Sequence, residues 1–241
     1  MPDSLKLPHY PHRTGVHPPL LSPEYGTTRL RAPSRPMRLM PQRLTEITGP
    51  LLGEGRLEPL DHDLTRQHEG EPHGQRIIVA GRVLDEDGRS IRNTLIEVWQ
   101  ANAAGRYAHR WDQHPAPLDP NFSGVGRCLT DAEGRYRFVT IMPGAYPWKN
   151  HPNAWRPAHI HFSLFGRAFP QRLVTQMYFP GDPLFDQDPI YNSIPDESVR
   201  KRLVCRWSLE LTEPDWALGY EWDIVLRGRS ATPWEREDDL R

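Results

Sequence analysis

The chain has 241 residues and a formal net charge of −1, and 37% of its residues are apolar. This balance argues against binding to nucleic acid or to an anionic membrane surface, and no apolar run is long enough to span a bilayer. The 26 prolines disfavour long helices and favour short strands, turns and ordered loops.

Residues 1–75 are rich in Pro, His, Arg and Gly and show little periodicity. Such a segment buries little of its own surface, so we predict an irregular arm that contacts the rest of the chain or a partner subunit. Within it, residues 42–48 indicate a short helix ended by Gly49-Pro50. We expect no secretory signal, and we expect Cys128 and Cys205 to be buried free thiols, as is typical of a cytoplasmic protein.

From residue 76 the pattern changes to short β-branched runs separated by turns. A short helix is expected at residues 195–202. The predicted strands lie at residues 76–84, 94–99, 127–130, 136–141, 158–165, 172–179, 203–211 and 221–226. This order predicts an all-β protein, a β-sandwich of antiparallel strands with few short helices. The sandwich would occupy residues 76–230 of a domain that spans 76–241.

His159 and His161 lie in one predicted strand. Side chains alternate along a strand, so both imidazoles share one face and Ile160 points to the other. Two imidazoles on one face are able to bind one metal ion, although by itself this pattern fits a solvated face better. The irregular residues 150–157 lead into the strand and carry Trp155 and Arg156, which fits a walled pocket.

Two tyrosines lie in turns of the sequence. Tyr107 follows a turn at residues 103–105, and Tyr146 lies in the proline-restricted loop 143–148. Taken alone, each fits an ordinary buried ring. A phenol, with a pKa of about 10, ionises at neutral pH only beside a strong Lewis acid such as ferric iron. The common zinc motifs, His-Glu-x-x-His and paired Cys-x-x-Cys, do not occur in the sequence.

Several long stretches carry a family pattern, among them Pro-Gly-Ala-Tyr-Pro-Trp at 143–148 and Trp-Arg-Pro-Ala-His-Ile-His-Phe at 155–162. The others are residues 21–25, 61–64, 81–83, 93–102, 105–107, 119–122 and 126–131. Together they resemble the intradiol aromatic-ring dioxygenases, and in particular the iron-carrying subunits of the members that act on protocatechuate. The resemblance covers nearly the whole chain.

The resemblance implies a non-haem ferric ion, Fe(3+), bound by a solvent-derived hydroxide and by Tyr107, Tyr146, His159 and His161. Two phenolates and one hydroxide neutralise the trivalent charge, and a neutral site costs less to bury than a charged one. By similarity, Tyr146 is the ligand that leaves when substrate binds and Tyr107 is the one that stays.

The resemblance also implies the reaction. Protocatechuate (3,4-dihydroxybenzoate) is cleaved with O2 between its two oxygenated carbons to 3-carboxy-cis,cis-muconate, a step of aromatic catabolism in the β-ketoadipate pathway. Arg156 is expected to stabilise the negative charge that develops on the substrate. Residues expected to line the substrate site are Tyr25, Trp99, Trp148 and Gln176. For Trp99, simple core packing is an equally good interpretation. For Gln176, a polar contact unrelated to catalysis is an equally good one.

The resemblance further implies a homologous α subunit that lacks the iron ligands and forms a hetero-oligomer with this chain. Three alternatives remain open from the sequence. The substrate is catechol or hydroxyquinol; the chain is a non-catalytic β-sandwich binding module; or the histidine pair binds zinc or ferrous iron, with Asp119 as a nominated carboxylate ligand.

Overall fold

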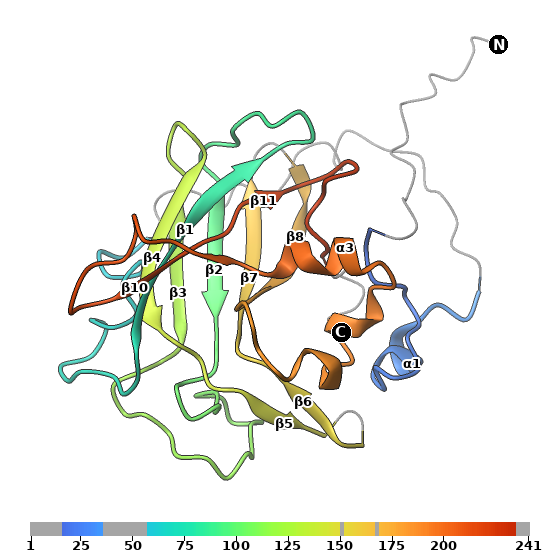
Figure 1. Ribbon diagram of the computed structural model, residues 1–241, viewed down its shortest axis with the longest axis horizontal. Coiled ribbons are helices and arrows are strands. Elements are labelled where there is room, and N and C mark those ends of the chain that lie inside the picture. The colour runs from blue at the N-terminus through green and yellow to red at the C-terminus, as the bar shows by residue number, and fades with distance from the viewer. Residues whose placement is uncertain (1–15, 36–56, 150–151, 167–168, 235–241) are drawn as a thin grey trace.

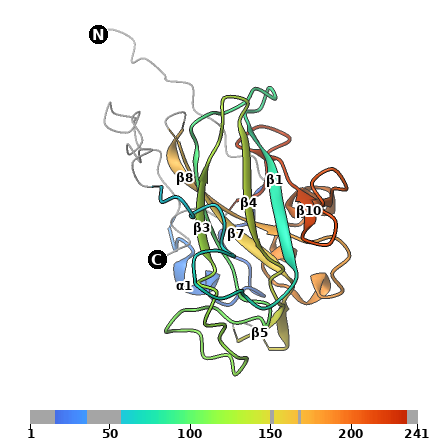
Figure 2. The same ribbon diagram turned by 90° about the vertical axis from the view of Figure 1, so that its left-hand side faces the viewer.

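Two β-sheets pack face to face in the computed structural model, which describes residues 16–35, 57–149, 152–166 and 169–234 (Figures 1 and 2). The helix expected at 42–48 lies outside the described residues. In the arm, a short helix α1 (Thr28–Arg31) precedes the first strand. Among the described residues, no helix has the length and apolar character that crossing a membrane requires.

The first sheet is centred on β1 (Arg76–Leu84), whose buried and exposed side chains alternate in its second half. β4 (Arg135–Ile141) runs antiparallel along one side of β1, and β10 (Leu218–Glu221) and β11 (Ile224–Val225) pair with the other side in parallel. The two-residue strand β9 (Arg206–Trp207) adds to β10 at the edge.

The second sheet has the order β3–β2–β7–β8 and is antiparallel throughout. Its strands are β3 (Val125–Leu129), β2 (Leu95–Trp99), β7 (His159–Gly166) and β8 (Phe169–Tyr178). In this register His161 lies between Trp99 on β2 and Gln176 on β8, and His159 lies opposite Tyr178. Pairing alone therefore brings three of the predicted site residues side by side.

The core fills the space between the two sheets. Tyr136 and Phe138 on β4 meet Phe162 on β7, with ring centroids 5.9 and 5.8 Å apart. Ile160 and Phe162 are fully buried on the inner face of β7, and burial of each such side chain stabilises the fold by about 1.5–3 kcal/mol. The alternation that places Ile160 inside leaves His159 and His161 together on the outer face.

Most predicted elements are present. β1, β2, β3, β4, β7 and β8 match six predicted strands to within three residues, and the all-β fold class is confirmed. The helix expected at 195–202 is α3 (Glu197–Arg200), capped by the Asp196 carboxylate, which accepts from the Ser198 N–H at 2.8 Å. It continues into the 3-10 helix η4 (Lys201–Leu203).

The strand predicted at 203–211 was mostly wrong. This run has the apolar alternation of one strand, yet its residues form hydrogen bonds with strands of two different sheets. The Cys205 N–H donates to the Tyr178 carbonyl at the end of β8, whereas Arg206–Trp207 pairs with β10. The chain then turns, because the Thr212 hydroxyl donates to the Ser208 carbonyl. The strand predicted at 221–226 likewise splits between β10 and β11.

A small hairpin replaces two segments that were expected to be irregular. β5 (Tyr146–Trp148) pairs with β6 (Ala154–Arg156), so that Tyr146 lies opposite Arg156. Its proline is tolerated because each strand of a two-stranded sheet has a free edge. In Figure 1 the hairpin lies at the end of the molecule where β7 begins. Two 3-10 helices, η2 (Phe185–Gln187) and η3 (Tyr191–Ser193), lie between β8 and α3.

Candidate metal centre

Two neutral imidazoles form one side of the site. The Nε2 atoms of His159 and His161 lie 3.2 Å apart on the outer face of β7. His159 Nδ1 is 2.7 Å from the Pro157 carbonyl, which only accepts, so Nδ1 carries the proton and the Nε2 lone pair is left for the site. Burial, reinforced by the charge of Arg156, lowers the pKa of His161 to about 3 and that of His159 well below its ordinary value.

Two tyrosines meet the imidazoles from separate loops. The Tyr107 N–H donates to the Asp112 carboxylate at 2.8 Å, which fixes its loop after β2. Tyr146 begins β5, just after Gly144. A Cβ on Gly144 would lie 2.4 Å from the Ala103 carbonyl oxygen, so only glycine allows the two loops to approach this closely.

The four side chains converge on one point. Tyr107 Oη lies 3.4 Å from Tyr146 Oη, 3.5 Å from His159 Nε2 and 3.1 Å from His161 Nε2, and Tyr146 Oη lies 3.4 Å from His159 Nε2. Donor atoms about 2 Å from a single metal ion have separations of this order. The structure therefore brings together all four residues that the sequence suggested as ligands.

The chemistry of this donor set suits a hard metal ion. Burial is the main reason that the pKa of Tyr107 lies well above its ordinary value, and it also raises the pKa of Tyr146. The phenols are thus protonated in the metal-free protein, and a cation placed between them would reverse this preference. Two anionic oxygens and two neutral nitrogens fit ferric iron.

Other metal sites find little support. Within the described parts of the chain, no three His, Cys, Asp or Glu side chains gather as a metal site would require. Asp119, the nominated carboxylate, instead accepts from the backbone N–H groups of His73 and Asn121 at 2.7 and 2.9 Å. It holds a loop, so nothing links it to the histidine pair. Cys128 and Cys205 are both buried and free.

Arg156 is buried beside the four donors, at the end of β6. Its Nε lies 3.1 Å from the carboxylate of Asp188, and its Nη2 donates to Gln176 Oε1 and, at 3.2 Å, to Tyr178 Oη. Burial opposes the charge, but Asp188 and the nearby hydroxyls outweigh it and raise the pKa of Arg156 well above its ordinary value. Arg156 therefore belongs to a buried ion pair as well as to the site. Sequence reasoning did not find Asp188 or Tyr178.

Gln176 and Trp99 flank His161 on the neighbouring strands. The Trp99 ring stacks on the imidazole with centroids 4.8 Å apart and planes 5° from parallel. Gln176 accepts from Arg156, and its Oε1 lies 3.0 Å from the Tyr178 hydroxyl. Both residues thus contact other members of the site.

Trp148 and Tyr25 connect the arm to Arg156 and the four donor side chains. The Arg156 guanidinium lies 5.5 Å from the centre of the Trp148 ring, and the Tyr25 ring lies 5.2 Å from that of Trp148. The Thr28 hydroxyl, 2.7 Å from the carbonyls of Ser22 and Tyr25, closes the turn that presents Tyr25. The arm therefore reaches the site through an aromatic contact.

Comparison with known proteins gives the family. A profile described as Dioxygenase matches residues 47–228, and one described as protocatechuate 3,4-dioxygenase beta subunit N terminal matches residues 10–43. The chain is 64% identical to the protocatechuate 3,4-dioxygenase beta chain of Burkholderia cepacia, over 91% of this chain and 94% of the relative. It is 27% identical to the alpha chain from Pseudomonas putida, over 82% of this chain and 97% of the relative.

A solved structure agrees. The 3-chlorocatechol 1,2-dioxygenase of Rhodococcus opacus 1CP superposes with a TM-score of 0.54 at 25% identity, covering 70% of this chain and 65% of that one. The profile match spans most of the chain, and the beta-chain relative matches nearly all of it. The chain belongs to the intradiol dioxygenase family.

Proposed function

We propose that this chain is the iron-carrying β subunit of a protocatechuate 3,4-dioxygenase. It cleaves protocatechuate with O2 to 3-carboxy-cis,cis-muconate. The observation that carries the proposal is the convergence of two phenol oxygens and two imidazole nitrogens, with separations of 3.1–3.5 Å. The identity to a protocatechuate 3,4-dioxygenase beta chain and the match of residues 10–43 favour protocatechuate over catechol or hydroxyquinol.

Tyr107, Tyr146, His159 and His161 would hold the ion. Ferric iron bound there supplies Lewis acidity, which acidifies the two hydroxyls of a catechol and prepares its ring for reaction with O2. The hydrogen bond from His159 Nδ1 to the Pro157 carbonyl keeps the His159 ring oriented for this task.

Tyr146 has a second role in the proposal, as the acceptor of one substrate proton at its Oη. Burial raises the pKa of Tyr146, so the neutral phenol is the favoured form once the residue no longer binds a cation. A positioned proton acceptor contributes about 10²- to 10⁴-fold to a rate. Tyr107, whose loop is held by Asp112, would remain a ligand throughout.

Arg156 would stabilise negative charge on the substrate during the reaction. A guanidinium stays charged at any working pH, and a preorganised charge in a buried site is effective because it needs no rearrangement. Trp148 and Trp99 would wall the cavity, and Gln176 would hold the Arg156 side chain. Tyr25, whose ring contacts that of Trp148, would help to hold the substrate carboxylate.

The test is the visible spectrum of the iron-loaded protein. Tyrosinate bound to ferric iron absorbs visible light, so the protein should be red-brown without haem. Tyr146→Phe should keep some iron, shift this band and lower kcat about a hundredfold. A colourless iron-loaded wild type would contradict the ligand assignment, and a higher kcat/KM for catechol than for protocatechuate would contradict the substrate.

We further propose a hetero-oligomer with a homologous α subunit, since this chain resembles both beta and alpha chains of such enzymes. The subunit would function in the cytoplasm, where its two free cysteines stay reduced. Co-purification followed by a mass measurement tests the partner. Full activity and stability of this chain alone would contradict it.

A further inference from the structure

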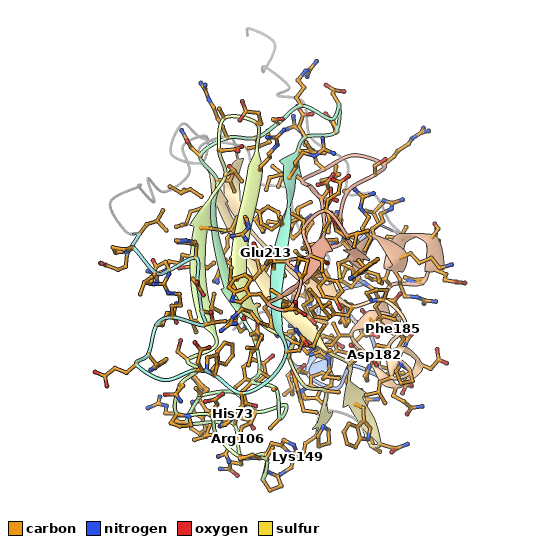
Figure 3. All side chains as sticks on the ribbon, turned by 60° about the vertical axis from the view of Figure 1, so that its left-hand side comes forward. His73, Arg106, Lys149, Asp182, Phe185 and Glu213 are labelled. Carbon is orange, nitrogen blue, oxygen red and sulfur yellow. The ribbon has the colours of Figure 1, made fainter. Side chains whose placement is uncertain are left out.

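The segment between β8 and α3 contacts, at two points, the residues that directly precede the histidine pair. Asp182 Oδ2 accepts from the Ala158 N–H at 3.0 Å, and the Asp188 carboxylate lies 3.1 Å from Arg156 Nε. These contacts fall on either side of Pro157, whose carbonyl orients His159. Figure 3 labels Asp182 and Phe185, which belong to this segment.

Asp188 is held in place by several hydrogen bonds in addition to its ion pair with Arg156. Its side chain is 0% exposed. Oδ1 accepts from the Ile190 N–H at 2.9 Å, and Oδ2 lies 3.0 Å from the Tyr178 hydroxyl. Its carbonyl also accepts from the backbone and side-chain N–H groups of Asn192 at 3.0 and 2.9 Å. The carboxylate therefore presents a fixed anchor to the guanidinium.

The buried positive charge of Arg156 depends on the Asp188 carboxylate. The Arg156 side chain is 3% exposed, so the guanidinium charge has little solvent to stabilise it and needs a nearby anion. Gln176 and Tyr178 accept from Nη2, but both are neutral. Because Asp188 holds Nε whereas Gln176 and Tyr178 both hold Nη2, the orientation of the guanidinium depends on the Asp188 carboxylate.

We propose that Asp188 is a positioning residue for the reaction and acts through Arg156. It holds the guanidinium in the orientation that stabilises charge on the substrate, and the Tyr178 hydroxyl, 3.0 Å from Asp188 Oδ2, supports the carboxylate. Asp188 itself does not touch the substrate. This inference rests on the proposed function, in which Arg156 faces a catecholic substrate.

The first experiment compares Asp188→Asn with Asp196→Asn in the iron-loaded protein. Asp196→Asn is the matched control: it makes the same chemical change at a residue that caps the exposed helix α3 and is not a member of the ion pair. We expect Asp188→Asn to lower kcat per bound iron about 10- to 100-fold. The visible band of the substrate-free protein should stay unchanged, since all four ligands remain. Asp196→Asn should leave both values unchanged.

A double-mutant cycle then separates positioning from general stability. In an Arg156→Gln background, adding Asp188→Asn should lower kcat by less than about twofold, because the group through which Asp188 acts is gone. An equal loss in both backgrounds, or an unchanged kcat for Asp188→Asn, would overturn the proposal.

Two further measurements keep the test decisive. If Asp188→Asn does not fold, Tyr178→Phe keeps the ion pair and removes the hydroxyl that lies beside Asp188 Oδ2 and accepts from Arg156 Nη2. It should lower kcat several-fold in the wild type and not in Arg156→Gln, and no loss in the wild type would overturn the proposal. An anaerobic titration of the visible band with protocatechuate reads substrate binding without turnover. A wild type that binds iron but shows neither a response nor cleavage defeats the proposed function itself.

Discussion

Two neighbouring clusters of polar side chains face the same site, and they are built on opposite principles. The donor cluster, Tyr107, Tyr146, His159 and His161, contains only groups that are neutral in the metal-free protein. The clamp cluster, Arg156, Gln176, Tyr178 and Asp188, contains a full positive and a full negative charge in direct contact. The first cluster needs an added ion to reach its working charge, whereas the second is complete without one.

The difference shows how the chain places a strong charge beside a metal centre. A lone buried guanidinium would repel an incoming cation and would be costly to bury. Paired with Asp188 it adds no net charge, yet its position is fixed by three partners. We therefore expect different effects from substitutions in the two clusters. Substitutions in the clamp cluster should lower the stability of the fold, and substitutions in the donor cluster should weaken metal binding.

The largest expected effect separates the clusters by stability in the metal-free protein. Asp188→Ala should lower the free energy of unfolding by about 3–5 kcal/mol, because it leaves the charge of Arg156 buried and unpaired. His161→Ala should lower it less, because it leaves no charge without a partner. Urea unfolding of both variants and the wild type measures the difference. Equal losses would show that the clamp cluster is not held by its charges.

The two clusters also differ in how readily they were found from the sequence. His159-Ile160-His161 lies in a strand, and strand alternation is a local rule, so the shared face was predictable and is observed. Asp188 lies 32 residues from Arg156 along the chain. Nothing local marks it as a partner, because the loop that brings it back has no regular pattern.

The errors in the fold have a similar cause. The run at 76–84 was placed correctly because β1 stays within one sheet along its length, beside β4 on one side and beside β10 and then β11 on the other. Residues 203–211 show comparable alternation but pass from the edge of one sheet to the other, which only tertiary contacts decide. The β5–β6 hairpin was missed because each strand has three residues and one contains a proline. The boundary between arm and domain at residue 75 stays a prediction.

The next effect concerns pH and the donor cluster alone. Burial keeps the phenols of Tyr107 and Tyr146 protonated by raising their pKa values, and it lowers the pKa of His161 to about 3. Near neutral pH both imidazoles are thus in their neutral form, and the metal-free site carries two phenol protons. Binding of ferric iron should expel at least these two, so iron affinity should fall about a hundredfold or more for each unit by which pH drops.

Competition with a chelator of known protonation between pH 6 and 8 measures that slope. A slope near zero would mean that the tyrosines are not ionised on binding, and the donor cluster would not be the ligand set. Arg156→Gln serves as the companion variant. The Arg156 guanidinium does not exchange a proton in this range. In Arg156→Gln the pH slope of iron affinity should therefore stay at two protons or more, while the activity falls.

The smallest effect tests where the donor cluster ends. The Trp99 ring stacks on His161, and contacts that orient a ligand from outside are worth about 10- to 100-fold in metal affinity. Because stacking is weaker than a hydrogen bond to a ligand, Trp99→Leu should lower iron affinity about tenfold, at the low end of that range. Trp207→Leu, on the exposed edge strand β9, is the matched control and should change nothing. If Trp99→Leu binds iron as tightly as the wild type, Trp99 acts only in packing, and the donor cluster holds His161 without help from β2.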